Sequence, residues 1–148
     1  MGEAEVSIRP AEERDAEAVA ALFQEWGHPL SCDEVCRKIR AFTQTPSHRF
    51  LVAEIDGAVV GFAAMNTALS PGRPRKIGVI SGMAVAPQHQ RRGIGRRLVE
   101  SAEQWLRSEG ASYIRVTTAS HRAETAHRFY PALGYLQTGI RFDKDLHP

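Results

Sequence analysis

The amino-acid sequence predicts an α/β fold: a single mixed domain over residues 1–148, with a mostly antiparallel sheet and helices on both faces. A chain of 148 residues fits one domain of ordinary size. Its composition, 43% hydrophobic and 24% charged, is typical of a globular protein. Apolar residues recur every two positions in the stretches expected to form strands and every three to four positions in those expected to form helices. The sequence contains no internal repeat.

The first third of the chain predicts one strand followed by two helices. Residues 6–9 alternate weakly before a proline, which favours a short strand. Asp15 is expected to cap a helix, and Ser31 and Glu34 have the spacing of a capping box for a second helix. The apolar residues of the first helix follow the spacing of one helical face: Val19, Leu22, Phe23 and Trp26.

The middle of the chain predicts an antiparallel meander. Residues 50–55 form an apolar strand, and Asp56-Gly57 is a strong signal for a two-residue hairpin turn. The chain returns over residues 58–66, and a third strand is expected over 77–85.

The last part predicts helices that alternate with strands. Amphipathic spacing after residue 93 indicates a helix that ends at Gly110, and residues 113–118 predict a further strand. The strand–helix–strand order requires a parallel step in the sheet. A short helix over 123–133 and two final strand segments around Thr138-Gly139 complete the expected order.

Composition also excludes several classes of protein. No apolar run approaches the ~20 residues of a membrane span, and the N-terminus lacks the pattern of a secretory signal, so a cytoplasmic location is expected. Cys32 and Cys36 are expected to be free thiols, because a metal site would need further Cys or His ligands. A net charge of +2 is too mild to predict a nucleic-acid partner.

The stretch VAPQHQRRGIGRRLVE, residues 85–100, predicts an anion site at the start of a helix. The first turn of a helix has unpaired N–H groups and partial positive charge, and Gly93 and Gly95 would let an anion approach them. A nucleotide-binding Gly-Lys-Ser/Thr sequence is absent, and Leu98 replaces the third glycine of a dinucleotide fingerprint. A glycine turn with a solvated basic end is the alternative. The basic residues are Arg91, Arg92, Arg96 and Arg97.

Four motifs resemble those of the GCN5-related N-acetyltransferases (GNAT). QRRGIG matches the family's Gln/Arg-x-x-Gly-x-Gly/Ala signature, and MAVAPQH precedes it as in the family's fourth strand and loop. AHRFYPALGY is similar to a later helix of the family, and GAVVGFAA to its third strand. The motifs occur in the family's order over nearly the whole chain.

The resemblance implies the GNAT-like acyl-CoA N-acyltransferase fold, with acetyl-CoA as co-substrate and no metal. The signature amides would hold the pyrophosphate, and the pantetheine arm would pair along the fourth strand, with Ser120 replacing a family asparagine. The implied cofactor-binding residues are Met83, Ala84, Val85, Gln90, Arg91, Arg92, Gly93, Ile94, Gly95, Arg96, Ser120 and Tyr130.

The resemblance further implies that Tyr130 is the general acid that protonates the leaving thiolate. No general base is evident, because the fourth strand, KIGVISGMAV, lacks the family's glutamate. A water chain is favoured, and the weaker candidates for a proton relay are Ser81, His121 and Glu124. Pro131 directly after Tyr130 removes a backbone N–H and is expected to change the last helical turn.

The acceptor is left open. The family implies a site near Trp26 and His28 for a primary amine, which belongs either to a small molecule or to a protein. The basic loop 73–76 either attracts an acidic acceptor or only contacts solvent. A direct attack in a ternary complex is expected. An acyl-CoA-binding sensor with little turnover is the alternative, and a nucleic-acid binder ranks third. Nothing in the sequence reports on a homodimer.

Overall fold

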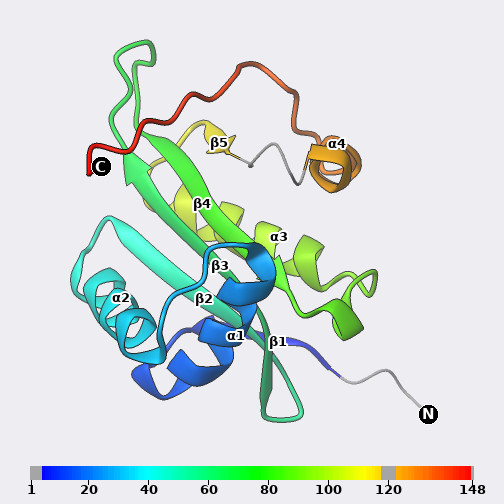
Figure 1. The fold of residues 1–148 in the computed structure, drawn as a ribbon. Coiled ribbons are helices and arrows are strands. Elements are labelled where there is room, and N and C mark those ends of the chain that lie inside the picture. The colour runs from blue at the N-terminus through cyan, green and yellow to red at the C-terminus, as the bar shows by residue number, and fades with distance from the viewer. Residues whose placement is uncertain (1–4, 118–122, 148) are drawn as a thin grey trace. The chain divides into compact units, whose positions relative to one another are not determined.

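The computed structural model describes residues 5–117 and 123–147, with the side chains of 123–127 left aside. It divides into two compact units, residues 1–116 and 117–148, each considered by itself. The first unit contains a five-stranded sheet with its strands in chain order (Figure 1). The strands are β1 (Ser7–Pro10), β2 (His48–Ile55), β3 (Ala58–Ala68), β4 (Ile77–Val85) and β5 (Ile114–Val116).

The pairing of the strands confirms the mixed sheet. The first four strands pair antiparallel, and β4 pairs with β5 in parallel. The parallel step is made through α3, as the strand–helix–strand order required. The helices are α1 (Ala16–Trp26), α2 (Cys32–Gln44), α3 (Ile94–Ser108) and α4 (Ala123–Ala132), with short 3-10 turns η1 (Glu13–Asp15) and η2 (Pro87–His89). None of the described helices is both long and apolar enough to cross a bilayer.

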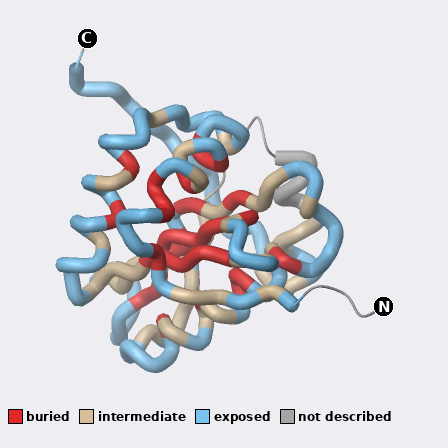
Figure 2. The backbone as a smooth tube through the Cα atoms, turned by 90° about the horizontal axis from the view of Figure 1, so that it is seen from below, coloured by how far each residue is buried: buried red, intermediate tan, exposed pale blue. Residues whose placement is uncertain are grey.

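An aromatic core lies between the sheet and the helices α1 and α2. The ring of Phe62 lies 4.9 Å from that of Phe23 and 5.4 Å from that of Phe50, measured between centroids. Val35 and Ile39 of α2 are buried in the same cluster. Buried residues accordingly gather along the central strands (Figure 2).

Helix α3 covers the opposite face of the sheet and packs closely on it. Leu98 and Leu106 are fully buried. A Cβ atom added to Gly78 of β4 would lie only 2.7 Å from Leu106 Cδ1, so glycine is required for this approach. Helices on both faces of the sheet are therefore confirmed.

Two irregular positions shape the central hairpins. Asp56 and Gly57 both have positive φ, 50° and 81°, which confirms a type I′ turn between β2 and β3. In the β3–β4 pair, Ala64 is opposite Gly82 but Met65 is opposite Ile80, so Ser81 is one extra residue in β4. Such a bulge reverses the face to which the following side chains point.

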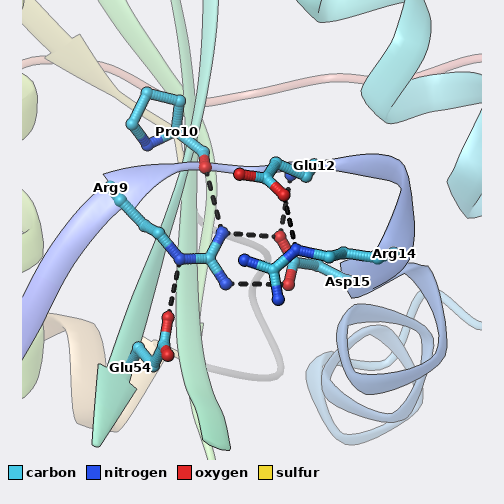
Figure 3. A network of polar contacts seen from close by, with 6 residues as sticks. All are labelled: Arg9, Pro10, Glu12, Arg14, Asp15 and Glu54. Atoms are coloured by element: carbon cyan, nitrogen blue, oxygen red, sulfur yellow. Dashed lines mark hydrogen bonds and ion pairs between the residues drawn. The ribbon is translucent and has the colours of Figure 1, made fainter. Parts of the chain in front are cut away.

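A polar network joins β1, η1 and β2 (Figure 3). Arg9 donates to both carboxylate oxygens of Asp15, at 2.8 and 2.9 Å, and to Glu54 Oε2 at 2.6 Å. Asp15 also accepts from the backbone N–H of Glu12 at 2.8 Å. Asp15 is the N-cap residue of α1, as predicted, but its carboxylate makes no cap hydrogen bond there and is bound by Arg9 and Glu12 instead.

The second helix begins after Ser31, as predicted, but the Glu34 carboxylate bonds the Ser31 hydroxyl, whereas in a capping box it would bond the backbone N–H of Ser31. The backbone N–H of Glu34 donates to Ser31 Oγ at 3.1 Å, as in a capping box. The Glu34 carboxylate accepts from the Ser31 hydroxyl, also at 3.1 Å. Cys32 and Cys36 are free thiols, and Cys32 is exposed.

The prediction of two final strands is wrong for the described chain. Residues 135–147 follow α4 without any strand. Their apolar residues alternate with polar ones, which is a strand pattern, but no strand of the described chain pairs with them.

Asp15→Asn tests the Arg9 network. Its hydrogen bonds with Arg9 hold the pKa of the Asp15 carboxyl below the ordinary value of 3.8, so the charged form stabilises the fold. The substitution is expected to lower the free energy of unfolding by about 1.5–3 kcal/mol at neutral pH, measured by urea denaturation.

Because the folded pKa is the lower one, this contribution is present at neutral pH and is lost as pH falls through the folded value. The difference between wild type and variant should therefore shrink below pH ~4. Asp33→Asn, an exposed acid in the first turn of α2, is the matched control. An equal loss in both variants, or a difference independent of pH, would contradict the role of the network.

Candidate functional site

The segment between β4 and α3 is held at both ends by hydrogen bonds to the sheet. Ala86 N donates to Val60 O at 2.8 Å, which extends the strand pairing. The side chain of Gln90 then donates from Nε2 to Val85 O at 3.0 Å. Gln90 therefore fixes the loop through its side chain and leaves its neighbours' backbone groups free to turn outward.

The loop backbone has the form of an anion-binding concavity. Arg91 has φ 64° and Gly93 has φ 79°, so two left-handed residues precede α3 within three positions. Among the described residues, no backbone carbonyl accepts from the amides of residues 91–96, and the next amide, that of Arg97, bonds Gly93 O at 3.1 Å. Consecutive free amides at a helix start bind anions well.

The four arginines of this region do not share one role. Arg91 and Arg92 are exposed. Arg96 Nε lies 3.9 Å from Glu100 Oε1, a weak pair within the helix. Arg97 donates to Val6 O at 2.9 Å and so binds the backbone ahead of β1. Arg97 was expected to place its positive charge near an anion, but its guanidinium binds the backbone carbonyl of Val6 instead.

Beside this loop, β4 continues beyond its pairing with β5. Among the described strands, residues 78–80 pair with β5, and residues 82–85 pair with β3. Met83 and Val85 are half-buried and Ala84 is buried. The expectation that the sheet splays open at Met83, Ala84 and Val85 stays a prediction.

Ser81 is the extra residue of the bulge, directly after the part of β4 that pairs with β5. The residue is exposed, and its Oγ donates to Ala64 O at 3.3 Å. A hydroxyl that donates to a backbone carbonyl has its proton engaged. Ser81 therefore serves the geometry of the bulge more directly than proton transfer.

Trp26 and His28 come together at the end of α1, against β4. Their ring centroids lie 4.2 Å apart, and Trp26 packs edge-on to Phe62 at 5.6 Å. A Cβ atom on Gly82 would lie 2.8 Å from Trp26 Cη2. Gly82 was missed by sequence reasoning, although a glycine inside a predicted strand does signal a close approach.

The basic loop 73–76 is mostly engaged within the first unit. The guanidinium of Arg73 lies 3.5 Å from the centroid of the Tyr113 ring. Lys76 Nζ donates to Glu109 O, at the end of α3, at 3.3 Å. Two of the three cations therefore stabilise the fold, which favours the structural interpretation of this loop.

Tyr130 lies in the second unit, at the end of α4. Tyr135 N donates to Tyr130 O at 3.1 Å, and Gly134 N donates to Pro131 O at 3.0 Å, with Gly134 at φ 93°. These are the two bonds of a Schellman end, in which Pro131 contributes its carbonyl. The rings of Phe129 and Tyr135 contact that of Tyr130 edge-on, at 5.0 and 5.8 Å.

Three predicted residues lie outside what the structure describes. Ser120 and His121 fall within residues 118–122, and the side chain of Glu124 falls within 123–127. Among the described residues, no group of three or more His, Cys, Asp or Glu side chains could hold a metal ion.

Comparison with known proteins identifies relatives along most of the chain. The model of the acetyltransferase (GNAT) family matches residues 11–135. The chain is 30% identical over 140 residues to the aminoalkylphosphonate N-acetyltransferase of Salmonella typhimurium, covering 94% of this chain and 90% of that protein. It is 26% identical over 134 residues to an uncharacterized N-acetyltransferase of Bacillus subtilis, covering 88% and 89%.

Solved structures share the fold at lower identity. An aminoglycoside N-acetyltransferase, AAC(6')-Iy in complex with CoA, has a TM-score of 0.86 at 17% identity over 99% of this chain and 98% of that chain. An acetyltransferase of Trypanosoma brucei has a TM-score of 0.78 at 22% identity, over 96% and 100%. The fold of this chain is therefore that of the family.

Gly82→Ala tests the contact between α1 and β4. The added methyl group forces Trp26 to move, and overpacking of this kind is expected to cost about 1–3 kcal/mol. Trp26 fluorescence, read in a Trp105→Phe background, should change in intensity and wavelength. Gly72→Ala is the control, because nothing lies within 4 Å of its Cβ position. Unchanged fluorescence in Gly82→Ala would contradict the close approach.

Proposed function

Since the chain belongs to the acetyltransferase (GNAT) family, we propose that it transfers the acetyl group of acetyl-CoA directly to a small primary amine, with both substrates bound in one ternary complex. Acetyl-CoA as the donor and an amine as the acceptor follow from the family. The direct attack, the small acceptor and the roles of individual residues are our proposal.

One observation carries the donor side: the run of backbone amides over residues 91–96 that no backbone carbonyl accepts from. In the proposal these amides bind the pyrophosphate of CoA, and Gly93 supplies the left-handed turn that aligns them. Arg91 and Arg92, both exposed, add charge that attracts the phosphates without direct fixed contacts. Gln90 and Val85 hold the loop in this form.

The end of β4 supports a place for the pantetheine arm and the thioester. An extended arm can pair with a strand edge, and in the proposal it lies along residues 82–85, beyond the residues of β4 that pair with β5. A backbone N–H near Met83 would then face the thioester oxygen. Attack by the amine places negative charge on that oxygen, which a fixed N–H donor stabilises.

The aromatic pair Trp26 and His28 supports the acceptor side. Trp26 lies against Gly82, one residue from Met83 on β4, so in the proposal an acceptor that rests on the pair is near the thioester. We favour a small amine because the relative that matches over 94% of this chain is named for an aminoalkylphosphonate. An amino acid or a protein amine is the alternative.

Proton transfer completes the proposed reaction. An alkylamine with a pKa of ~10.4 must lose a proton before it attacks, and water is proposed to accept it because Ser81 already donates to Ala64 O. As nitrogen bonds the acetyl carbon, the carbon–sulfur bond breaks and the thiolate takes a proton from Tyr130. The nitrogen then loses its extra proton, which returns through water to the Tyr130 oxygen and leaves a neutral amide and a neutral tyrosine. A phenol with a pKa of ~10 still holds that proton at pH 7.

Gly93→Asp tests the donor site. An aspartate places a carboxylate among the amides, so the thermal shift caused by CoA should disappear. For wild type that shift corresponds to about 2.7 kcal/mol at 100 times the dissociation constant. Gly110→Asp is the matched control, because it also has positive φ, 95°, at the other end of α3.

Both glycine variants are expected to lose roughly 1–2 kcal/mol of stability from left-handed strain. Only Gly93→Asp should also lose CoA binding. Undiminished CoA binding by Gly93→Asp would contradict the assignment of the pyrophosphate site.

Tyr130→Phe tests the proton donor. The rate of CoA release with an aminoalkylphosphonate as acceptor should fall about 100-fold, while the dissociation constant of CoA stays unchanged. Tyr135→Phe, which keeps the neighbouring ring, should retain full activity. An unchanged rate in Tyr130→Phe would assign the proton to water. Absence of turnover with every amine, despite CoA binding, would favour the acyl-CoA sensor.

A further inference from the structure

We propose that the indole of Trp26 limits the acyl group of the donor to acetyl, because it fills the space beside Gly82 that a longer acyl chain needs. The inference rests on the proposed function, since it takes the thioester to lie near Met83 on β4. It adds a limit on the length of the transferred group, which the proposed function leaves open.

Trp26 lies with the edge of its six-membered ring against the backbone of Gly82. A Cβ atom on Gly82 would lie 2.8 Å from Trp26 Cη2 and 3.0 Å from Trp26 Cζ2. Both distances are shorter than an ordinary contact between two carbon atoms, so no further carbon fits between the ring and the strand. The indole therefore occupies the space that a side chain at this position of β4 would fill.

The end of α1 fixes the backbone that carries this ring. Trp26 is the last residue of α1, and Gly27 follows it with φ 93°. His28 N donates to Phe23 O at 3.0 Å. Gly27 N donates to Gln24 O at 3.1 Å, which gives the pair of bonds of a Schellman end. The helix end thus sets where the indole begins.

Aromatic neighbours hold the indole in one orientation. The ring centroids of Phe23 and Phe62 lie 5.4 and 5.6 Å from that of Trp26, both in edge-on contacts. The ring of His28 lies 4.2 Å away. Contacts of this kind stabilise particular ring orientations in addition to the burial of apolar area. Trp26 is only half-buried, so part of this fixed ring remains accessible to a ligand.

In the proposal, the acyl group of the donor lies next to this ring. With the thioester oxygen at the N–H near Met83, the acetyl carbon is one residue from Gly82 along β4. The methyl of an acetyl group is small enough to remain beside the strand. Each further carbon extends towards the indole, and closely packed side chains do not admit added carbons without strain.

Trp26→Phe tests this limit. Phenylalanine keeps an aromatic ring for the contacts with Phe23 and Phe62 but lacks Cη2 and Cζ2, the two atoms nearest Gly82. Trp26→Leu repeats the test with an aliphatic side chain, so that one folded variant is sufficient. Trp105→Phe is the matched control, because its ring centroid lies 5.9 Å from the guanidinium carbon of Arg49, on α3.

Isothermal titration calorimetry gives the dissociation constants of CoA, acetyl-CoA and butyryl-CoA. No acceptor is added, so the measurement reports binding of the donor alone. Wild type and Trp105→Phe are expected to bind CoA and acetyl-CoA similarly and butyryl-CoA about tenfold more weakly, as overpacking of this size predicts. Both Trp26 variants should keep the affinity for CoA and bind acetyl-CoA and butyryl-CoA almost equally. If circular dichroism shows that neither variant folds, the wild-type ratio decides alone.

Three results would overturn the proposal. Equal affinity of wild type for acetyl-CoA and butyryl-CoA means that nothing limits the chain at this site. Discrimination that persists in a folded Trp26 variant assigns the limit to another side chain. In both cases CoA still binds, so the proposed function stands. Absence of CoA binding by wild type removes the donor site itself, and the proposed function then fails together with this inference.

Discussion

The extra residue in β4 at Ser81 is the constraint on which the candidate site depends. Before it, Gly78 faces α3, and after it, Gly82 faces Trp26 of α1. One strand therefore serves both helical layers, which an unbroken strand with a period of two could not do at these positions. Ser81 also directly follows the last residue of β4 that pairs with β5, so the bulge lies where this pairing ends among the described strands.

The Arg9 network supports the site from a distance. Its bidentate contact with Asp15 fixes the turn that leads into α1, and the contact with Glu54 fixes that turn to β2. Trp26 lies at the other end of α1, so its position over Gly82 depends on where the helix begins. Arg97 adds a second tie, from the start of α3 to the backbone ahead of β1. Arg9 and Arg97 thus hold the frame, whereas Arg91 and Arg92 remain exposed at the loop before α3.

Short sequence motifs predicted much of this structure. The predictions that failed concern contacts with residues outside those motifs. The Asp56-Gly57 turn, the Ser31 cap and the glycine turn before α3 each act within a few residues, and the family suggested by QRRGIG is confirmed. Asp15 looked like a helix cap, but its carboxylate binds an arginine six residues earlier, which spacing alone does not reveal. The C-terminal alternation predicted two strands, but the described residues 135–147 form none, because a strand also needs a pairing partner, which alternation does not specify.

The left-handed backbone of Arg91 has a consequence for how this protein can change over time. A residue with a Cβ atom at φ 64° costs roughly 1–2 kcal/mol relative to the right-handed region, and no described backbone carbonyl compensates the amides that this turn exposes. A glycine there would relieve the strain but would also loosen the turn and remove a positive charge. If this turn binds the donor as proposed, thermostability and donor affinity are in conflict at Arg91, and selection for one is expected to erode the other.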